Sequence, residues 1–208
     1  MFAYIRHGDR EMPDGLNSIK RCFGDGDPLM ERYHDDEWGA PTHSDAEHYE
    51  LLVLEGAHAG LSWRTVLHRR EAYRDAFSCF DPGKVAGYTP EAINDIVACT
   101  GIIRNRRKVE SAVNNARAFL RVQDKFGSFD EYIWGFVGHK PVMNAYTDWR
   151  QVPSETDASR AMSRDLKERS FSFVGPTICY AYMQSAGMVN DHLTSCFRWS
   201  QIRELCIR

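Results

Sequence analysis

Four side chains with metal-binding donor atoms lie in two pairs at opposite ends of the chain. Cys22 and His34 are near its start, and His192 and Cys196, four positions apart, are near its end. Two thiolates and two imidazoles form a set that Zn²⁺ binds tetrahedrally, with no position left for water. If the pairs meet, the metal is a structural staple and catalysis must take place elsewhere. Spacing alone also fits four unrelated residues, because the pairs are so far apart in the sequence.

A second group of residues has the chemistry to hold a flat ligand. Glu55 is a carboxylate late in an otherwise apolar predicted helix, and Trp63 offers a flat apolar face. Gly60, between them, allows a ligand to approach the backbone closely. Composition alone favours plainer interpretations, namely core packing for Trp63 and Tyr33 and a solvated helix end for Glu55.

The elements that must position these residues are predicted to be helices. Ser44 and Glu47 form a capping box that begins the first of them, and Pro82 and Pro90 each follow an N-cap residue. Helices are predicted to begin at residues 44, 82 and 90 and to cover about 63–77, 102–125, 128–136, 157–169 and 176–187. Strand-like alternation is almost absent, so the sequence predicts an all-α protein. If His192 and Cys196 lie on a helix, they share one face of it.

The size and composition suit one domain with a large core. The chain has 208 residues and a formal net charge of −3, which does not indicate a nucleic-acid partner but leaves room for a local basic patch. Residues 1–20 are predicted to be a loose extension, and residues 21–208 a single domain. No apolar run approaches a membrane span, and the N-terminus lacks the apolar core of a secretion signal. The cysteines include no CxxC pair, and Cys79, Cys99, Cys179 and Cys206 are expected to be buried thiols in a cytoplasmic protein.

Six ordered motifs carry a resemblance that covers about residues 21–197. They are YHDDEWG at 33–39, LEGAHAGLSW at 54–63, GIIRN at 101–105, NARA at 115–118, FVGPTICY at 173–180 and VNDH at 189–192. They resemble the DNA-3-methyladenine glycosylase I family of base-excision repair enzymes. The resemblance implies an all-α helix-hairpin-helix fold with two helical lobes around a base pocket. It also implies one structural zinc per chain, bound by Cys22, His34, His192 and Cys196.

The activity that the resemblance implies is hydrolysis of the N-glycosidic bond of 3-methyladenine in double-stranded alkylated DNA, by a monomer that releases the free base and does not cleave the strand. A base methylated at N3 is positively charged while attached and leaves as a neutral base, so the bond is already weak. The enzyme must extrude the nucleotide, which costs about a few kcal/mol, and then recognise the cation and position water. Glu55 is implied as the catalytic recognition carboxylate, because a buried anion favours a cation.

The other implied site residues bind the base or the DNA. Tyr33 and Trp63 resemble the aromatic residues of the family's base pocket, and Phe23 is expected to add a wall. Leu61, beside Gly60, is expected to fill the gap left in the duplex. Gly175 and Thr177 lie in the predicted hairpin and are expected to meet a phosphate. Arg104 leads the basic residues expected at DNA, with Arg106, Arg107 and Lys108 beside it and Arg69, Arg70, Lys167 and Arg169 as further candidates.

Two departures from the family concern the expected pocket. His58 stands where the family commonly has Gln, three residues after Glu55 on the same helical face, and Met30 stands where Tyr is frequent. They leave open which alkylated bases are accepted, and they keep a non-catalytic or altered-specificity DNA-lesion-binding protein as the alternative. A zinc hydrolase is a third hypothesis, but four protein ligands would deny it an open coordination position. Asp191 is expected to orient a zinc ligand or to cap a helix rather than to act as a general base.

Overall fold

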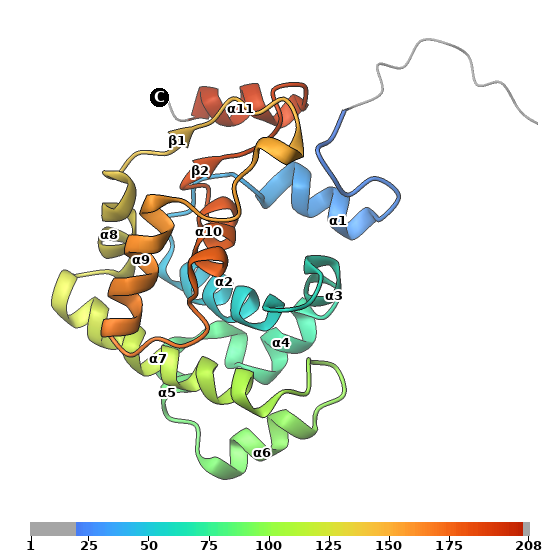
Figure 1. Ribbon diagram of the computed structural model, residues 1–208. Coiled ribbons are helices and arrows are strands. Elements are labelled where there is room, and N and C mark those ends of the chain that lie inside the picture. Colours follow the sequence, from blue (N-terminus) through green and yellow to red (C-terminus); the bar gives the residue numbers. More distant parts are fainter. Residues whose placement is uncertain (1–19, 206–208) are drawn as a thin grey trace, which may run out of the picture.

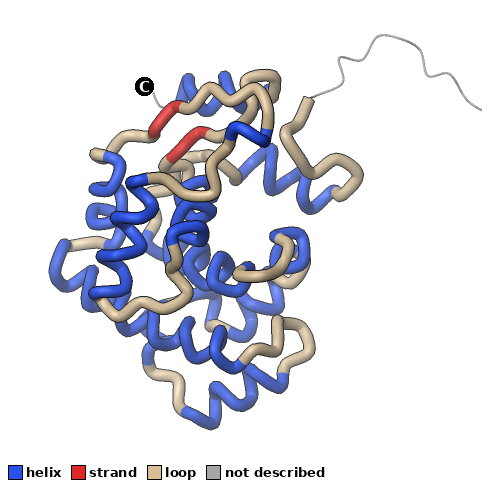
Figure 2. The backbone as a smooth tube through the Cα atoms, in the orientation of Figure 1, coloured by secondary structure: helices blue, strands red, loops and turns tan. Residues whose placement is uncertain are grey.

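Helices make up almost all the regular structure of the computed structural model, which describes residues 20–205 (Figures 1 and 2). The predicted all-α fold is thereby confirmed. The first half contains α1 (Pro28–Arg32), η1 (Tyr33–Glu37), α2 (Asp45–His58), α3 (Trp63–Leu67), α4 (Arg70–Ala76), η2 (Ser78–Phe80), α5 (Pro82–Ala86) and α6 (Pro90–Ala98). The second half contains α7 (Arg106–Phe126), α8 (Phe129–Trp134), η3 (Gly135–Val137), η4 (Trp149–Gln151), α9 (Asp157–Glu168), α10 (Pro176–Ser185) and α11 (Phe197–Leu205). The predicted N-terminal extension, apart from Lys20, lies outside the described residues, as does Cys206.

The helix α2 runs through the middle of the molecule, where α3, α7, α8 and α10 pack against it (Figure 1). Its residues from His48 to Ala57 are all buried. A helix that is buried on all sides must be apolar almost all round, and the four consecutive apolar residues from Leu51 to Leu54 meet this requirement. Glu55 follows directly in this buried helix. The fold therefore places a carboxylate in the core rather than at a solvated helix end.

Side-chain caps begin most of the helices at the expected residues. The hydroxyls of Ser44 and Ser128 accept from the backbone N–H groups three residues later, and Asp81 and Thr89 do the same before Pro82 and Pro90. The predicted capping box at Ser44 is only half formed, because the Glu47 carboxylate accepts from the Thr42 hydroxyl instead. The start of α2 is thus also tied to the preceding loop.

The helix predicted over residues 63–77 is wrong in one respect, because it is two helices. α3 ends at Leu67, Arg69 leaves the helical region with φ −111° and ψ 3°, and α4 begins at Arg70. The break turns the chain so that Leu67 and Tyr73 are buried in different clusters, Leu67 with aromatic residues of η1 and Tyr73 in the main core. A period of 3.6 residues cannot reveal such a turn, since both halves keep the helical pattern.

A helical hairpin is formed by α9 and α10, which pack against each other. The turn between them is held by Asn115 of α7, whose Oδ1 accepts from the Ser172 N–H at 2.8 Å and whose Nδ2 donates to the Ser172 carbonyl at 3.0 Å. Phe173 in this turn adopts a left-handed φ of 57°, and its Cβ lies 3.6 Å from where a Cβ on Gly56 of α2 would stand. The turn is therefore fixed directly against the central helix.

The two ends of the described chain meet at one side of the molecule, where the blue start and the red end lie close together (Figure 1). The Phe197 N–H donates to the Lys20 carbonyl at 3.2 Å. Nearby, β1 (Val142–Met143) and β2 (Val189–Asn190) form a short parallel pair. Between residues 20 and 205, no helix is both long and apolar enough to cross a membrane. Cys179 is buried as expected, but Cys79 is exposed, contrary to the prediction.

Candidate active site and metal centre

A cavity of about 250 Å³ opens beside the end of α2. All five residues expected at the ligand line it, namely Glu55, His58, Trp63, Tyr33 and Phe23. They come from α2, α3, η1 and the loop before α1, so only folding brings them together. The sequence analysis missed five further lining residues: Trp38, Trp149, Ala181, Gln184 and Ser185. Trp38, Ala181, Gln184 and Ser185 lie in or beside matched motifs, whereas no motif surrounds Trp149.

Glu55 is 2% exposed and both of its oxygens are engaged. Ser185 Oγ donates to Oε1 at 2.7 Å, and Nδ1 of His58 lies 3.1 Å from Oε2. The Tyr33 hydroxyl donates in turn to Ser185 Oγ at 3.0 Å. An ionised carboxylate only accepts hydrogen bonds, so the chain of donors runs from Tyr33 through Ser185 to Glu55. Burial, followed by the negative charge of Glu55, raises the pKa of Tyr33 well above its ordinary value, which keeps this phenol a donor.

The cavity combines one negative charge with aromatic walls. Glu55 is the only acidic residue among those that line it. The ring of Tyr33 lies 5.2 Å from that of Trp63, and His58 meets Trp63 edge to face at 5.6 Å. The buried indole N–H of Trp63 has no hydrogen-bond partner within the described part of the chain. Such a site suits a flat, positively charged ligand, because indole faces and a buried carboxylate both attract cations.

Lys108 fixes the end of α2 that carries this carboxylate. Its ammonium group donates to the carbonyls of Ala57 and Ala59 at 2.8 and 2.7 Å. A positive charge at a helix C-terminus satisfies free carbonyls and complements the helix dipole. Lys108 was a candidate DNA contact, but in the structure its ammonium group is engaged with these two carbonyls.

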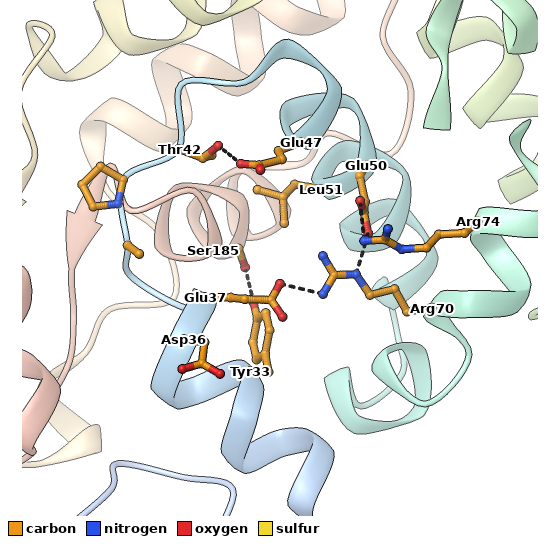
Figure 3. A pocket seen from close by; sticks show the side chains of 12 residues that line it. Tyr33, Asp36, Glu37, Thr42, Glu47, Glu50, Leu51, Arg70, Arg74 and Ser185 are labelled. Carbon is orange, nitrogen blue, oxygen red and sulfur yellow. Dashed lines mark hydrogen bonds and ion pairs between the residues drawn. The ribbon is translucent and has the colours of Figure 1, made fainter. Parts of the chain in front are cut away.

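A second cavity, of about 240 Å³, lies behind Tyr33 and Ser185, which line both cavities (Figure 3). Its polar wall is an ion-pair network in which Arg70 contacts Glu50 and Glu37, and Arg74 also contacts Glu50. Arg70 was a further candidate for DNA binding. The structure instead places it inside this network, only 19% exposed.

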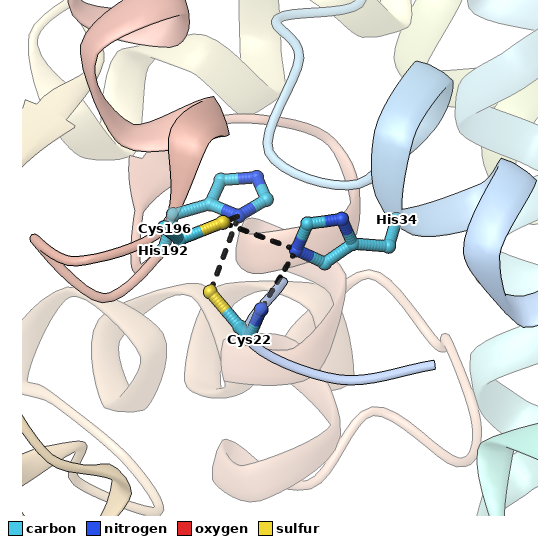
Figure 4. Close-up of side chains that lie close together, drawn as sticks. All are labelled: Cys22, His34, His192 and Cys196. Carbon is cyan, nitrogen blue, oxygen red and sulfur yellow. Dashed lines mark hydrogen bonds between the residues drawn. The ribbon is translucent and has the colours of Figure 1, made fainter. Parts of the chain in front are cut away.

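The four predicted metal ligands meet, and their donor atoms all lie within 4.8 Å of one another (Figure 4). Sγ of Cys196 is 3.4 Å from Nε2 of His34, and Sγ of Cys22 is 3.5 Å from Nδ1 of His192. Bond lengths of about 2.3 Å to sulfur and about 2.1 Å to nitrogen would put tetrahedral neighbours about 3.6 Å apart. The donor set and its spacing therefore fit a tetrahedral metal ion.

The surroundings of these donors also fit a metal. The second ring nitrogen of each imidazole is engaged, Nδ1 of His34 by Asp35 at 2.8 Å and Nε2 of His192 by the Trp38 carbonyl at 2.9 Å. Such contacts orient metal-binding histidines. The two thiols share a proton: hydrogen bonds from Cys22 and then from the two imidazoles lower the pKa of Cys196, whereas the contact with Cys196 and then burial raise the pKa of Cys22. His192 and Cys196 lie in the turn between β2 and α11, so a shared helical face does not explain their proximity.

Asp191 neither orients a metal ligand nor caps a helix. Its carboxylate is fully buried and accepts from Asn144 Nδ2 at 2.7 Å, the Tyr180 hydroxyl at 2.6 Å and Gln184 Nε2 at 2.7 Å. It therefore ties α10 to the segment around β1. It is not among the described residues that line the cavity at Glu55.

Several of the residues expected at DNA lie at the surface. Gly60 has φ +79° with open space where a Cβ would stand, and the adjacent Leu61 side chain is 41% exposed. Gly175 is the N-cap of α10, also with open space beside it, and Thr177 is exposed. Arg104 is exposed and has no ion-pair partner among residues 20–205. Arg106 contacts Asn94 and Glu110, and Arg169 is held by Asp165.

Comparisons with known proteins point to one family. The family model described as methyladenine glycosylase matches residues 23–199. DNA-3-methyladenine glycosylase from Haemophilus influenzae is 48% identical over 164 residues, which cover 79% of this chain and 89% of that protein. A crystal structure of 3-methyladenine DNA glycosylase I superposes with a TM-score of 0.84 at 44% identity, covering 86% of this chain and 98% of the other. A second structure, a variant of the same kind of enzyme in complex with 3-methyladenine, superposes with a TM-score of 0.81 at 35% identity, covering 83% and 92%.

Proposed function

The chain belongs to the methyladenine glycosylase family, and we propose that the cavity beside Glu55 is where it holds the base that it releases. Its activity is hydrolysis of the N-glycosidic bond of 3-methyladenine in alkylated DNA. The single observation that supports this site best is a buried carboxylate, already oriented by Ser185 and His58, as the only acid that residues 20–205 contribute to an aromatic cavity. A neutral base would gain little from that charge, whereas a cationic base is attracted to it.

In this proposal the protein contributes recognition and water exclusion rather than a strong acid. Glu55 faces the positively charged base and stabilises it, and Tyr33 and Ser185 hold the carboxylate in place. Trp63 stacks on one face of the base, and Phe23 closes the pocket beside Tyr33. The methylated base departs with the electrons of the broken C–N bond and becomes neutral without being protonated. Water forms the new bond to the sugar carbon and releases one proton to the solvent. Preorganised electrostatics of this kind often supplies the largest part of an enzyme's rate enhancement.

His58 is proposed to hold Glu55 rather than to exclude the substrate. Its Nδ1 lies 3.1 Å from Oε2 of Glu55, and its ring meets that of Trp63 edge to face. In that arrangement the imidazole makes the hydrogen bond to Glu55 that an amide would otherwise make. 3-Methyladenine therefore stays the expected substrate.

The metal centre is proposed to be one structural zinc per chain, held by Cys22, His34, His192 and Cys196. When bound, the ion supplies cross-linking and no open coordination position. The four residues join the loop before α1 and η1 to the turn before α11. Residues 21–208 are then one glycosylase domain, with two helical lobes around the pocket and the staple between the chain's two ends.

The partner is proposed to be double-stranded DNA, bound by a cytoplasmic monomer. The exposed Leu61 side chain is positioned to fill the gap left by the extruded base, beside the open turn at Gly60. The hairpin at Gly175 and Thr177 presents backbone N–H groups at the start of α10, where a phosphate is favoured. Arg104 supplies an unpaired charge. No lysine lines the cavity within the described residues, which supports base release without strand cleavage.

The test of this function is the release of free 3-methyladenine from methylated double-stranded DNA by purified, zinc-loaded protein. The expected result is a chromatographic peak of the free base with the DNA strand left intact at the abasic site. Absence of that peak, while a known glycosylase releases the base in parallel, would contradict the proposal. Binding of methylated DNA without release would instead support the non-catalytic alternative.

A further inference from the structure

The wall of the base pocket opposite the end of α2 includes an indole that none of the matched motifs contains. Trp149 is the first residue of η4, between β1 and α9, and it lines the same cavity as Glu55 and Trp63. Trp149 is 38% exposed, whereas Trp38 and Tyr33, which line the same cavity, are 7% and 3% exposed. Trp149 is therefore the most accessible of these three aromatic residues.

The indole is fixed at its polar end. Its Nε1–H donates to the Cys22 carbonyl at 3.0 Å. The turn that presents it is fixed as well, because Asp148 accepts from the Arg150 N–H at 2.8 Å and Thr147 donates from its backbone to Gln151 at 2.8 Å. Because its N–H already has a hydrogen-bond acceptor, the indole is held in this orientation.

Aromatic neighbours support the ring from the protein side. Its centroid lies 6.1 Å from that of Trp38 and 6.4 Å from that of Phe23, at interplanar angles of 52° and 47°. Phe23 and Trp38 themselves meet edge to face at 5.1 Å. These two rings support Trp149 from within the protein.

We propose that Trp149 is a substrate-binding residue that covers a face of the extruded base, so that the base lies between two indoles, those of Trp149 and Trp63. This inference rests on the proposed function and deepens it. It makes the loop of Cys22 part of the pocket, since the carbonyl next to a metal-binding thiol positions the wall. Base stacking tolerates different bases, so the residue sets affinity for flat bases in general, and Glu55 selects among them by charge.

The test compares Trp149→Leu and Trp149→Phe with the unaltered protein in two assays: affinity for free 3-methyladenine by calorimetry, and single-turnover excision from methylated DNA. Trp149→Leu removes the ring and is expected to weaken base affinity roughly tenfold, which is within the range of one aromatic stack. Trp149→Phe keeps a ring but loses the N–H, and is expected to restore most of the affinity. Zinc content and melting temperature, measured on both variants, report on the hydrogen bond to Cys22.

A matched control is Trp199→Leu. Trp199 also donates its indole N–H to a backbone carbonyl, that of Asn144 at 2.7 Å, but it does not line the cavity. The Trp199→Leu variant is expected to bind 3-methyladenine as tightly as the unaltered protein. If Trp149→Leu binds the base as tightly as the unaltered protein, the inference is overturned. It is also overturned if Trp149→Phe is as weak as Trp149→Leu, because the ring would not be the cause. If the unaltered protein neither binds nor releases 3-methyladenine, the proposed function itself has failed.

Discussion

Ser185 and Glu55, from helices α10 and α2, are joined by a hydrogen bond of 2.7 Å between the serine hydroxyl and the buried carboxylate. The bond continues to the Tyr33 hydroxyl at 3.0 Å. Three segments of the chain thus converge on one charge: His58 contacts Glu55 from within α2, whereas Ser185 and Tyr33 belong to α10 and η1.

Ser185→Ala is expected to lower single-turnover excision about tenfold, because it leaves Glu55 Oε1 and the Tyr33 hydroxyl without their partner. An unsatisfied buried polar group costs about 1–3 kcal/mol. Excision kinetics and melting temperature should be measured together, with Ser200→Ala as the control, since that hydroxyl contacts only the Phe197 carbonyl. Unchanged excision in Ser185→Ala would show that the carboxylate is positioned without this bond.

Glu55→Gln is expected to lower kcat/KM by roughly 10²–10³, the usual effect of removing one preorganised electrostatic group. The amide keeps the shape but not the charge that attracts the cationic base. Zinc content and melting temperature should remain near those of the unaltered protein. Glu47→Gln, on the same helix but outside the base pocket, is the matched control. An active Glu55→Gln variant would remove this carboxylate from the mechanism.

Loss of a metal ligand is expected to act first on stability. Cys196→Ser should lower zinc content and reduce the melting temperature by at least about 5 °C, because metal affinity contributes to folding free energy. A chelator should shift the unaltered protein in the same direction. Cys99→Ser is the control, since Cys99 is not among the four donors. Full zinc content and unchanged melting in Cys196→Ser would rule out the staple.

Stability is expected to fall below about pH 6.5 through His48. This imidazole is buried between the Tyr182 hydroxyl at 2.6 Å and Asp130 at 3.0 Å. Burial lowers its pKa below the ordinary 6.5, although Asp130 opposes the shift. As pH falls, the histidine of the unfolded chain is therefore protonated before that of the folded chain. Below pH 6.5, His48 thus lowers the free energy of unfolding by up to about 1.4 kcal/mol per pH unit.

The measurement for His48 is the melting temperature from pH 7.5 to pH 5. His48→Gln should be less stable at pH 7.5 but should lose less stability on acidification than the unaltered protein. His139→Asn removes an exposed imidazole and serves as the control. Equal slopes for His48→Gln and the unaltered protein would mean that other groups set the acid dependence.

Lys108 and Arg104 are close in sequence but are expected to behave differently. Lys108→Met should lower the free energy of unfolding by about 1–2 kcal/mol through the lost contacts with the Ala57 and Ala59 carbonyls, without altering the salt dependence of DNA binding. Arg104→Ala should leave stability unchanged and reduce the salt slope of DNA binding by about 1. The checks are chemical denaturation and DNA titrations at several salt concentrations. If Lys108→Met alone changed the salt slope, its assignment to the helix end would be wrong.

The sequence by itself determined the elements and much of the site's membership. Helix starts at Ser44, Pro82 and Pro90 depend on residues within a few positions, so local patterns reveal them. The resemblance carried by the ordered motifs implied Glu55 and Trp63 for the pocket, and it implied the four candidate metal donors, whose atoms the fold brings within 4.8 Å of one another. Each of these inferences used either local chemistry or a resemblance that already contained the fold.

Only the tertiary structure decided which partners complete each group. The contacts of Ser185 with Glu55 and of Lys108 with the end of α2 join distant segments, as does that of Trp149 with Cys22. Asp191 received its role in the same way, from the side chains that converge on it. A donor's preference for some acceptor is a property of its residue type, but which acceptor it meets depends on how the helices pack, and that is set by burial of the whole core.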